Sequence, residues 1–173
     1  MRRGASFNNL TLQTKLTSED ILNRIKRESV NKTVEECKFF YNDIQPKIKE
    51  LYQELNKIGL VFSHIKWEIG DFTEENLFEQ DKNWYKTFDS LLPAHEDIYS
   101  DIILTINKIE AFAISFTDGI ADKEVGMISI GNAYRKQIEN IYPFIAIWRS
   151  RERKDEDNFY NKTIELYRIW KKN

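Results

Sequence analysis

The strongest candidate for chemistry in this sequence is one carboxylate, Glu110, which interrupts the apolar residues 109–114 within the most apolar helix that the pattern predicts. Asn107 lies one helical turn before it, on the same face. A carboxylate buried in such surroundings is costly unless a cation or hydrogen-bond donors compensate its charge. We expect the partner to be Arg135 or Arg149, which belong to the next helical segment.

Three interpretations of Glu110 stay open. It can form a structural ion pair that fixes the register of two helices, which is the ordinary role of a buried pair. It can instead line a polar pocket in the core that binds a ligand or supports a reaction. It can also lie simply exposed on the surface. Only the second interpretation would make the chain an enzyme or a ligand-binding protein.

The two histidines offer little for metal binding or acid–base catalysis. His64 is followed four residues later by Glu68, and His95 precedes an acidic stretch over 96–101. Acids around a histidine are also typical of a solvated helix start. Two histidines and one cysteine cannot make the usual zinc ligand sets, and the Glu-x-x-His pairs of di-iron bundles are absent. We expect no metal, no cofactor and no catalytic residue.

Other catalytic motifs are missing as well. Gly126 and Gly131 lie inside a helical pattern without a following Gly-Lys-Ser/Thr, so there is no phosphate-binding loop, and no Gly-x-Ser-x-Gly elbow occurs. Helical RNA-cleaving toxins and phage-defence effectors carry an Arg-x4-6-His motif. Neither histidine here has an arginine five to seven residues before it. An active ribonuclease of that kind is not expected, whereas a degenerate, non-catalytic relative stays open.

A basic run is the only candidate for contacts with nucleic-acid phosphates. It consists of Arg149, Arg151, Arg153 and Lys154, and four acidic residues interleave with it. The formal net charge of -2 gives no electrostatic reason for nucleic-acid binding. We interpret residues 151–157 as a solvated hinge.

Composition places the chain among globular proteins, because 41% of its residues are hydrophobic and 31% are charged. Cys37 is the only cysteine, which excludes an intramolecular disulfide and favours a reducing compartment such as the cytoplasm. No stretch approaches the ~18 apolar residues of a membrane span. Residues 1–16 lack the apolar segment of a signal peptide, so we treat them as a disordered or expression-derived tail. Residues 17–173 are expected to form one domain.

Two helices are predicted in the first third of that domain. Thr17 and Asp20 are spaced as a capping box, and a short docking arm follows as far as Glu28. A long helix over 33–58 then carries a seam with three- and four-residue spacing, typical of a core face or, alternatively, of an intermolecular coiled coil. Pro46 lies opposite this seam and should kink the helix toward solvent. The seam consists of Val34, Cys37, Tyr41, Ile44, Ile48, Leu51, Leu55 and Ile58.

The remainder of the chain is also helical in pattern. Residues 60–72 alternate as a strand would, yet a lone strand would have no partner, so we expect a connector. Asp122 should cap the fourth main helix, and Pro143 should kink it. The predicted fold is an all-α bundle of four main helices with an additional short helix at each end. The main helices span 33–58, 73–92, 93–118 and 122–150, and the last short helix spans 159–170.

From Asn31 onward, the order of short motifs resembles an uncharacterised bacterial helical family that is known only as a domain of unknown function. The motifs are Asn31–Glu35, Asn107–Ala113, Asp118–Ile120 with Asp122, Tyr142–Ile145 with Arg149, and Phe159–Trp170. The resemblance implies an all-α domain, often found behind an N-terminal membrane helix that this chain lacks. It marks Glu110, Asp118, Asp122 and Arg149 as pattern positions and implies no reaction.

These observations favour a non-enzymatic helical module for interaction or assembly, and the resemblance implies an accessory role in a bacterial membrane or phage-defence system. We expect a protein partner or a homo-oligomer, because Trp67, Trp84 and Tyr85 suggest surplus exposed aromatic surface. Membrane contact would come only through a missing anchor or a partner, at the cytoplasmic face. The alternative is a ligand-binding or enzymatic bundle around Glu110, and a nucleic-acid binder comes third.

Overall fold

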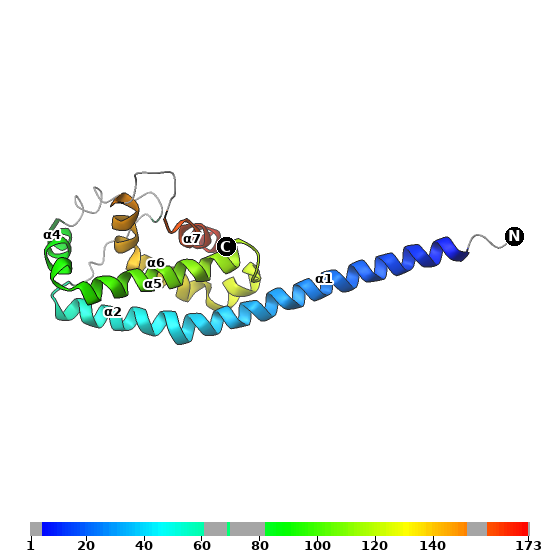
Figure 1. The fold of residues 1–173 in the computed structure, drawn as a ribbon, viewed down its shortest axis with the longest axis horizontal. Coiled ribbons are helices and arrows are strands. Elements are labelled where there is room, and N and C mark those ends of the chain that lie inside the picture. The colour runs from blue at the N-terminus through cyan, green and yellow to red at the C-terminus, as the bar shows by residue number, and fades with distance from the viewer. Residues whose placement is uncertain (1–4, 61–68, 70–81, 152–158, 173) are drawn as a thin grey trace.

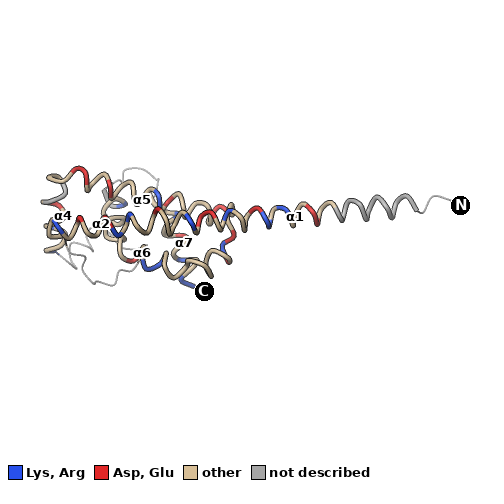
Figure 2. The backbone as a smooth tube through the Cα atoms, turned by 90° about the horizontal axis from the view of Figure 1, so that it is seen from below, with Lys and Arg blue, Asp and Glu red and all other residues tan. Residues whose placement is uncertain are grey.

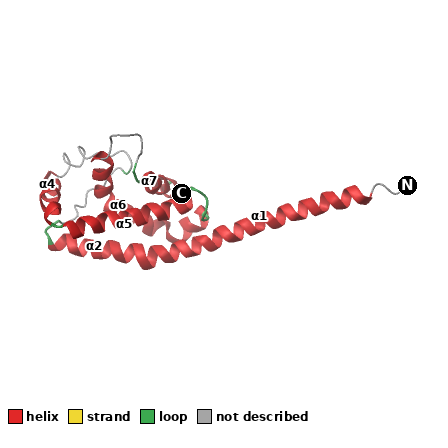
Figure 3. Ribbon diagram, viewed as in Figure 1, coloured by secondary structure: helices red, strands yellow, loops and turns green. Residues whose placement is uncertain are grey.

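The computed structural model describes residues 5–60, 69, 82–151 and 159–172, and within these ranges all regular structure is helical (Figure 3). The all-α prediction is therefore confirmed. The elements in chain order are α1 (Ala5–Phe39), η1 (Phe40–Ile44), α2 (Gln45–Lys57), α4 (Lys82–Leu91), η2 (Leu92–Ala94), α5 (Glu96–Thr117), α6 (Lys123–Arg151) and α7 (Asn161–Lys171).

Helices α1 and α2 form one continuous rod, joined by η1, a single turn of π-helix (Figure 1). The two helices predicted over 17–28 and 33–58 are therefore parts of one rod. Thr17, predicted as a helix start, lies inside α1, which begins at Ala5. Residues 5–16 are accordingly helical and not an irregular tail, and residues 1–4 lie outside the described residues.

The π-helical turn has its cause in Pro46, the second residue of α2. Proline has no N–H to donate, and in an uninterrupted α-helix its ring would collide with the carbonyl group of Asn42, four residues back. In the structure the N–H of Gln45 bonds instead to the oxygen of Phe40, five residues back. This wider turn accommodates the proline, whose side chain is exposed as predicted. The expected kink thus takes the form of a π-bulge.

One extra residue in the π turn rotates the two halves of the rod relative to each other by about one position. After the turn the predicted seam is buried, with Ile44, Ile48, Leu51 and Leu55 in the core. Before the turn, the buried positions lie one residue earlier than predicted. They are Thr33, Glu36 and Phe40 instead of Val34, Cys37 and Tyr41.

Helix α5 is the central helix, as predicted, and α6 returns along it. The C-terminal residues of α5 lead into a turn in which Gly119 has a φ of 77°, the left-handed region that favours glycine. Asp122 then caps α6, because its Oδ1 accepts the N–H groups of Glu124 and Val125 at 3.0 and 3.1 Å. Figure 1 shows α6 bending where its colour passes from yellow to orange, the part that contains Pro143.

Aromatic side chains of α4 fill one end of the core. Trp84 stacks on Phe88 with ring centroids 5.3 Å apart, and both rings pack against Phe144 of α6. Trp84 is buried and Tyr85 is half-buried against the core, so the predicted aromatic surface is wrong at these two positions. Trp67 lies outside the described residues.

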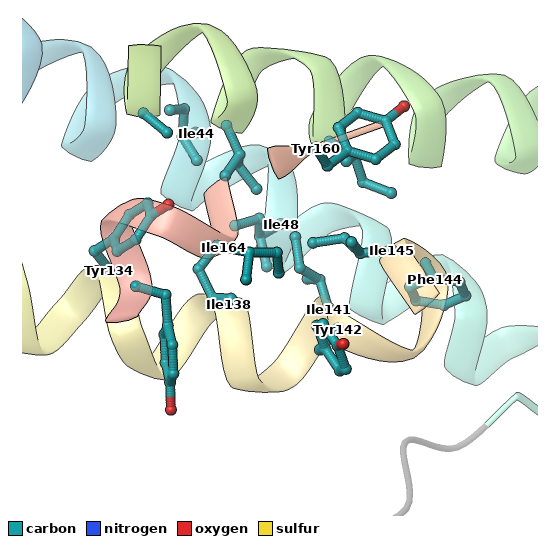
Figure 4. Packing of buried hydrophobic residues seen from close by; sticks show 14 of the residues in the cluster. Ile44, Ile48, Tyr134, Ile138, Ile141, Tyr142, Phe144, Ile145, Tyr160 and Ile164 are labelled. Atoms are coloured by element: carbon teal, nitrogen blue, oxygen red, sulfur yellow. The ribbon is translucent and has the colours of Figure 1, made fainter. Parts of the chain in front are cut away.

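The last helix, α7, lies against both α5 and α6 and belongs to the core. Trp170 packs edge-on against Phe116 and Tyr134, with ring centroids 5.1 and 5.2 Å apart. Figure 4 shows Ile164 of α7 among isoleucines contributed by the rod and by α6. The additional C-terminal helix is therefore part of the bundle and not a peripheral element.

The outer part of α1 leaves the bundle altogether. We call residues 5–28 the arm, which at 1.5 Å per residue extends roughly 36 Å. Figure 1 shows it projecting alone beyond the other helices. Every described side chain of the arm, from Thr17 to Glu28, is exposed.

Candidate functional site

Helix α7 begins without a cap of its own. Its N-cap residue, Tyr160, has a φ of 60° and a ψ of 30°, a left-handed conformation that is uncommon for a bulky residue, and its side chain makes no capping bond. The first backbone N–H groups of any helix lack partners within the helix. Acceptors for α7 must therefore come from another part of the chain.

Glu110 on α5 supplies these acceptors. Its Oε1 accepts the N–H of Lys162 at 3.1 Å, and its Oε2 accepts the N–H of Thr163 at 2.8 Å. The hydroxyl group of Thr163 donates to the same Oε2 at 2.6 Å. A negative charge also complements the partial positive charge of a helix N-terminus. The half-buried carboxylate is thus the N-cap of α7, provided by a neighbouring helix.

The predicted arginine partners of Glu110 are wrong. Arg135 donates to Asn132 on its own helix. Arg149 donates to the carbonyl oxygen of Phe159 at 3.3 Å and to Oδ1 of Asn161 at 3.1 Å. Arg149 therefore holds the same chain segment as Glu110 does, at the start of α7, without pairing with the carboxylate.

Two more of the predicted positions meet at this helix start. Oδ1 of Asn107 accepts the hydroxyl of Tyr160 at 3.1 Å, and Asp118 binds Nζ of Lys162 at 2.7 Å. The ammonium group of Lys162 lowers the pKa of Asp118. Asn107, Glu110, Asp118 and Arg149, which we call the α7 cap cluster, therefore all hold the start of one helix.

The hydrogen bonds of the Glu110 carboxylate are made to groups of the protein itself. Both carboxylate oxygens accept hydrogen bonds from α7, so its position is explained without a ligand. Beneath it, burial and the charge of Glu110 raise the pKa of Tyr134 well above its usual value. Across the part of the chain that the structure describes, no three His, Cys, Asp or Glu side chains gather as metal ligands would.

A second polar contact, which the sequence did not reveal, fixes α1 to the bundle. Glu36 is only 7% exposed, yet it accepts the Oγ–H of Ser115 at 2.9 Å and pairs with Nζ of Lys32 at 3.1 Å. One turn earlier, the hydroxyl of buried Thr33 accepts the N–H of Asp122 at 2.7 Å. The last docked turns of α1 are therefore held by polar contacts to the end of α5 and the start of α6.

Cys37 lies beside this contact and is half-buried. Burial and the neighbouring charge of Glu36 raise the pKa of its thiol. A thiol with a raised pKa is a poor nucleophile, because the thiolate is the reactive form. The surroundings of Cys37 therefore do not favour a nucleophilic role for its thiol.

The face by which α1 docks on the bundle continues along the arm. Thr33, Glu36 and Phe40 follow one another at three- and four-residue spacing, and the same spacing leads back through Ser29 to Ile25 and Leu22. Leu22 is 64% exposed and Ile25 is 57% exposed, and Ile21 lies beside them. We call Ile21, Leu22 and Ile25 the arm face. It has the geometry of a helix-packing surface, but no described residue covers it.

Comparisons with protein families, with curated proteins and with solved structures find no match. No helix in the described ranges has an apolar stretch long enough to cross a bilayer.

Proposed function

We propose that this chain is a non-enzymatic helical interaction module whose binding element is the arm. The observation that carries the proposal is the arm face, because it prolongs the docking face of α1 beyond the helices that the structure describes. An exposed apolar group on such a face is typical of a protein interface.

The energetics of an isolated helix support this proposal. A single helix without tertiary contacts is marginal in water, because most helical stability in proteins comes from packing of an apolar face. Burial of one Leu or Ile side chain contributes about 1.5–3 kcal/mol. A partner that covers Leu22 and Ile25 would therefore both stabilise the arm and gain affinity from it.

The alternative function, a ligand-binding or enzymatic bundle around Glu110, has less support. The polar groups of the α7 cap cluster bind the start of one helix, and the raised pKa of the Cys37 thiol disfavours the reactive thiolate. The interaction module explains the exposed arm face, which the alternative leaves without a role.

Site-specific photo-crosslinking in cells that make the protein tests the proposal. A photoreactive residue at Ile25 is expected to give a discrete protein adduct. The matched control is Ile128 of α6, which is 81% exposed but lies on the bundle. The adduct at position 25 should disappear with Leu22→Glu. Equal adducts at positions 25 and 128, or none at 25, would contradict the proposed function.

A further inference from the structure

We infer that the occupant of the arm face is the arm of a second copy of this chain, bound antiparallel across a two-fold axis. This inference rests on the proposed function and names its partner. In such a symmetric pair each arm presents the same face to the other. The centre of the contact lies between Leu22 and Ile25 of each copy.

The bundle itself selects the antiparallel direction. The arm face lies on the same side of α1 as Thr33 and Glu36, which α5 and α6 cover inside each chain. In a parallel pair, α1 of either copy would have to occupy the space that α5 and α6 of the other copy already fill. An antiparallel pair instead places the two bundles at opposite ends of the joined arms.

The charges of the arm fit this direction. Moving inward along the arm, Glu19 and Asp20 precede the arm face, whereas Lys26 and Arg27 follow it (Figure 2). Arg24 and Glu28 pair with each other on their own helix at 2.9 Å, so their charges offset within one copy. Glu19 and Lys26 are seven residues apart, so they flank the arm face on the same side. A two-fold axis near Asn23 brings Glu19 of one copy beside Lys26 of the other, and the reverse. The arm is therefore complementary in charge to its own antiparallel copy.

The contact must be a crossing and not a long coiled coil. The α5–α6 turn stands against Thr33, only one turn inward of Ser29, and a partner helix lying strictly parallel to the arm would run into it. Helices that cross at the common angle of about 50° diverge quickly enough to pass beside the turn. A crossing of this size predicts a reversible, concentration-dependent dimer.

Sedimentation velocity of the purified full chain tests the partner. We expect a reversible dimer over the micromolar range. Leu22→Glu should weaken dimerisation at least about a hundredfold, because both copies lose a buried leucine. Ile128→Glu, the matched bundle control, should leave it unchanged. A parent protein that stays monomeric, or an equal effect of the two substitutions, overturns the inference.

Charge exchange tests the pairing. The variant Glu19→Lys with Asp20→Lys and the variant Lys26→Glu with Arg27→Glu should each dimerise several-fold more weakly than the parent at low salt. An equimolar mixture should recover the dimer, because the altered charges then attract across the interface. Weak association in the mixture as well would overturn the charge complementarity.

Cysteine crosslinking with a short bismaleimide tests the direction, in a Cys37→Ser background. A mixture of Ser18→Cys and Ser29→Cys chains should crosslink readily, because an antiparallel crossing brings these two positions within reach of the spacer, although the divergence of the helices leaves them too far apart for a disulfide. Crosslinking of Ser18→Cys with itself instead would mean a parallel pair.

The mass of the photo-crosslinked adduct distinguishes failure of the second-copy inference from failure of the proposed interaction function. An adduct of twice 20.7 kDa supports self-pairing, whereas any other discrete mass overturns the second-copy inference and leaves the proposed function standing.

Discussion

Replacing Glu110 by alanine removes the three hydrogen bonds by which its carboxylate caps α7. Two backbone N–H groups and the hydroxyl of Thr163 lose their acceptor, and the negative charge at the helix N-terminus disappears. Loss of an N-cap costs about 0.5–2 kcal/mol, and loss of a favourable charge at a partly buried helix end adds about 0.3–2 kcal/mol. We expect Glu110→Ala to lower the free energy of unfolding by about 2–3 kcal/mol.

Urea denaturation followed by circular dichroism measures this change. Glu165→Ala is the matched control, because this exposed acid on α7 pairs, among the described residues, with Lys162 at 3.5 Å, and its loss should cost under about 0.5 kcal/mol. Glu110→Gln keeps an acceptor oxygen but loses the charge, so its stability should lie between those of the parent and the alanine variant. A loss with Glu110→Ala no larger than that with Glu165→Ala would refute the capping role.

Two further predictions concern packing and titration. Gly126→Ala should destabilise the protein by about 1–3 kcal/mol in the same assay, because its Cβ would overlap the ring of buried Phe116. Gly131→Ala should change the stability by less than about 1 kcal/mol, because the nearest atom to its Cβ would be Cγ of Met127 at 3.3 Å, and the ring of Trp170 would lie at an ordinary contact distance of 3.9 Å. Burial and the carboxylate of Glu139 raise the pKa of Tyr167 to about 12. Because folding holds this phenol protonated, its contribution to stability should be intact below pH 10 and lost as the pH rises toward 12. If spectrophotometric titration of the folded protein gives Tyr167 a pKa near the ordinary tyrosine value of about 10, the prediction is wrong.

The helices could be predicted from the sequence because apolar spacing reports directly on a buried face. The π turn could not, because a proline inside a helical pattern predicts a disturbance but not its form. Here the π turn accommodates Pro46 with one extra residue. As a result, the buried face differs from the predicted seam by one position in α1, which precedes the turn, but not in α2, which follows it. Val34 and Tyr41 therefore lie exposed, although their spacing suits a core seam.

The candidate site shows a similar limit. Glu110 stands out in the sequence because a carboxylate in an apolar helix needs compensation. Its partners do not stand out, because backbone N–H groups occur at every residue and carry no sequence signature. That α7 begins at a left-handed tyrosine without its own cap is visible only in the structure. Asn107 and Arg149 were predicted as members of a buried polar pair and Asp118 as a pattern position, and nothing in the sequence pointed to the start of α7 as their common target.

Hydrogen–deuterium exchange of the arm shows directly whether a second copy of the chain covers the arm face. An uncovered helix of this length should exchange its amides rapidly, whereas a helix whose apolar face is covered exchanges slowly. We predict slow exchange over residues 17–28 at high protein concentration, with fast exchange on dilution and in Leu22→Glu at every concentration. Fast exchange of this segment in the parent at all concentrations, indistinguishable from Leu22→Glu, would contradict it.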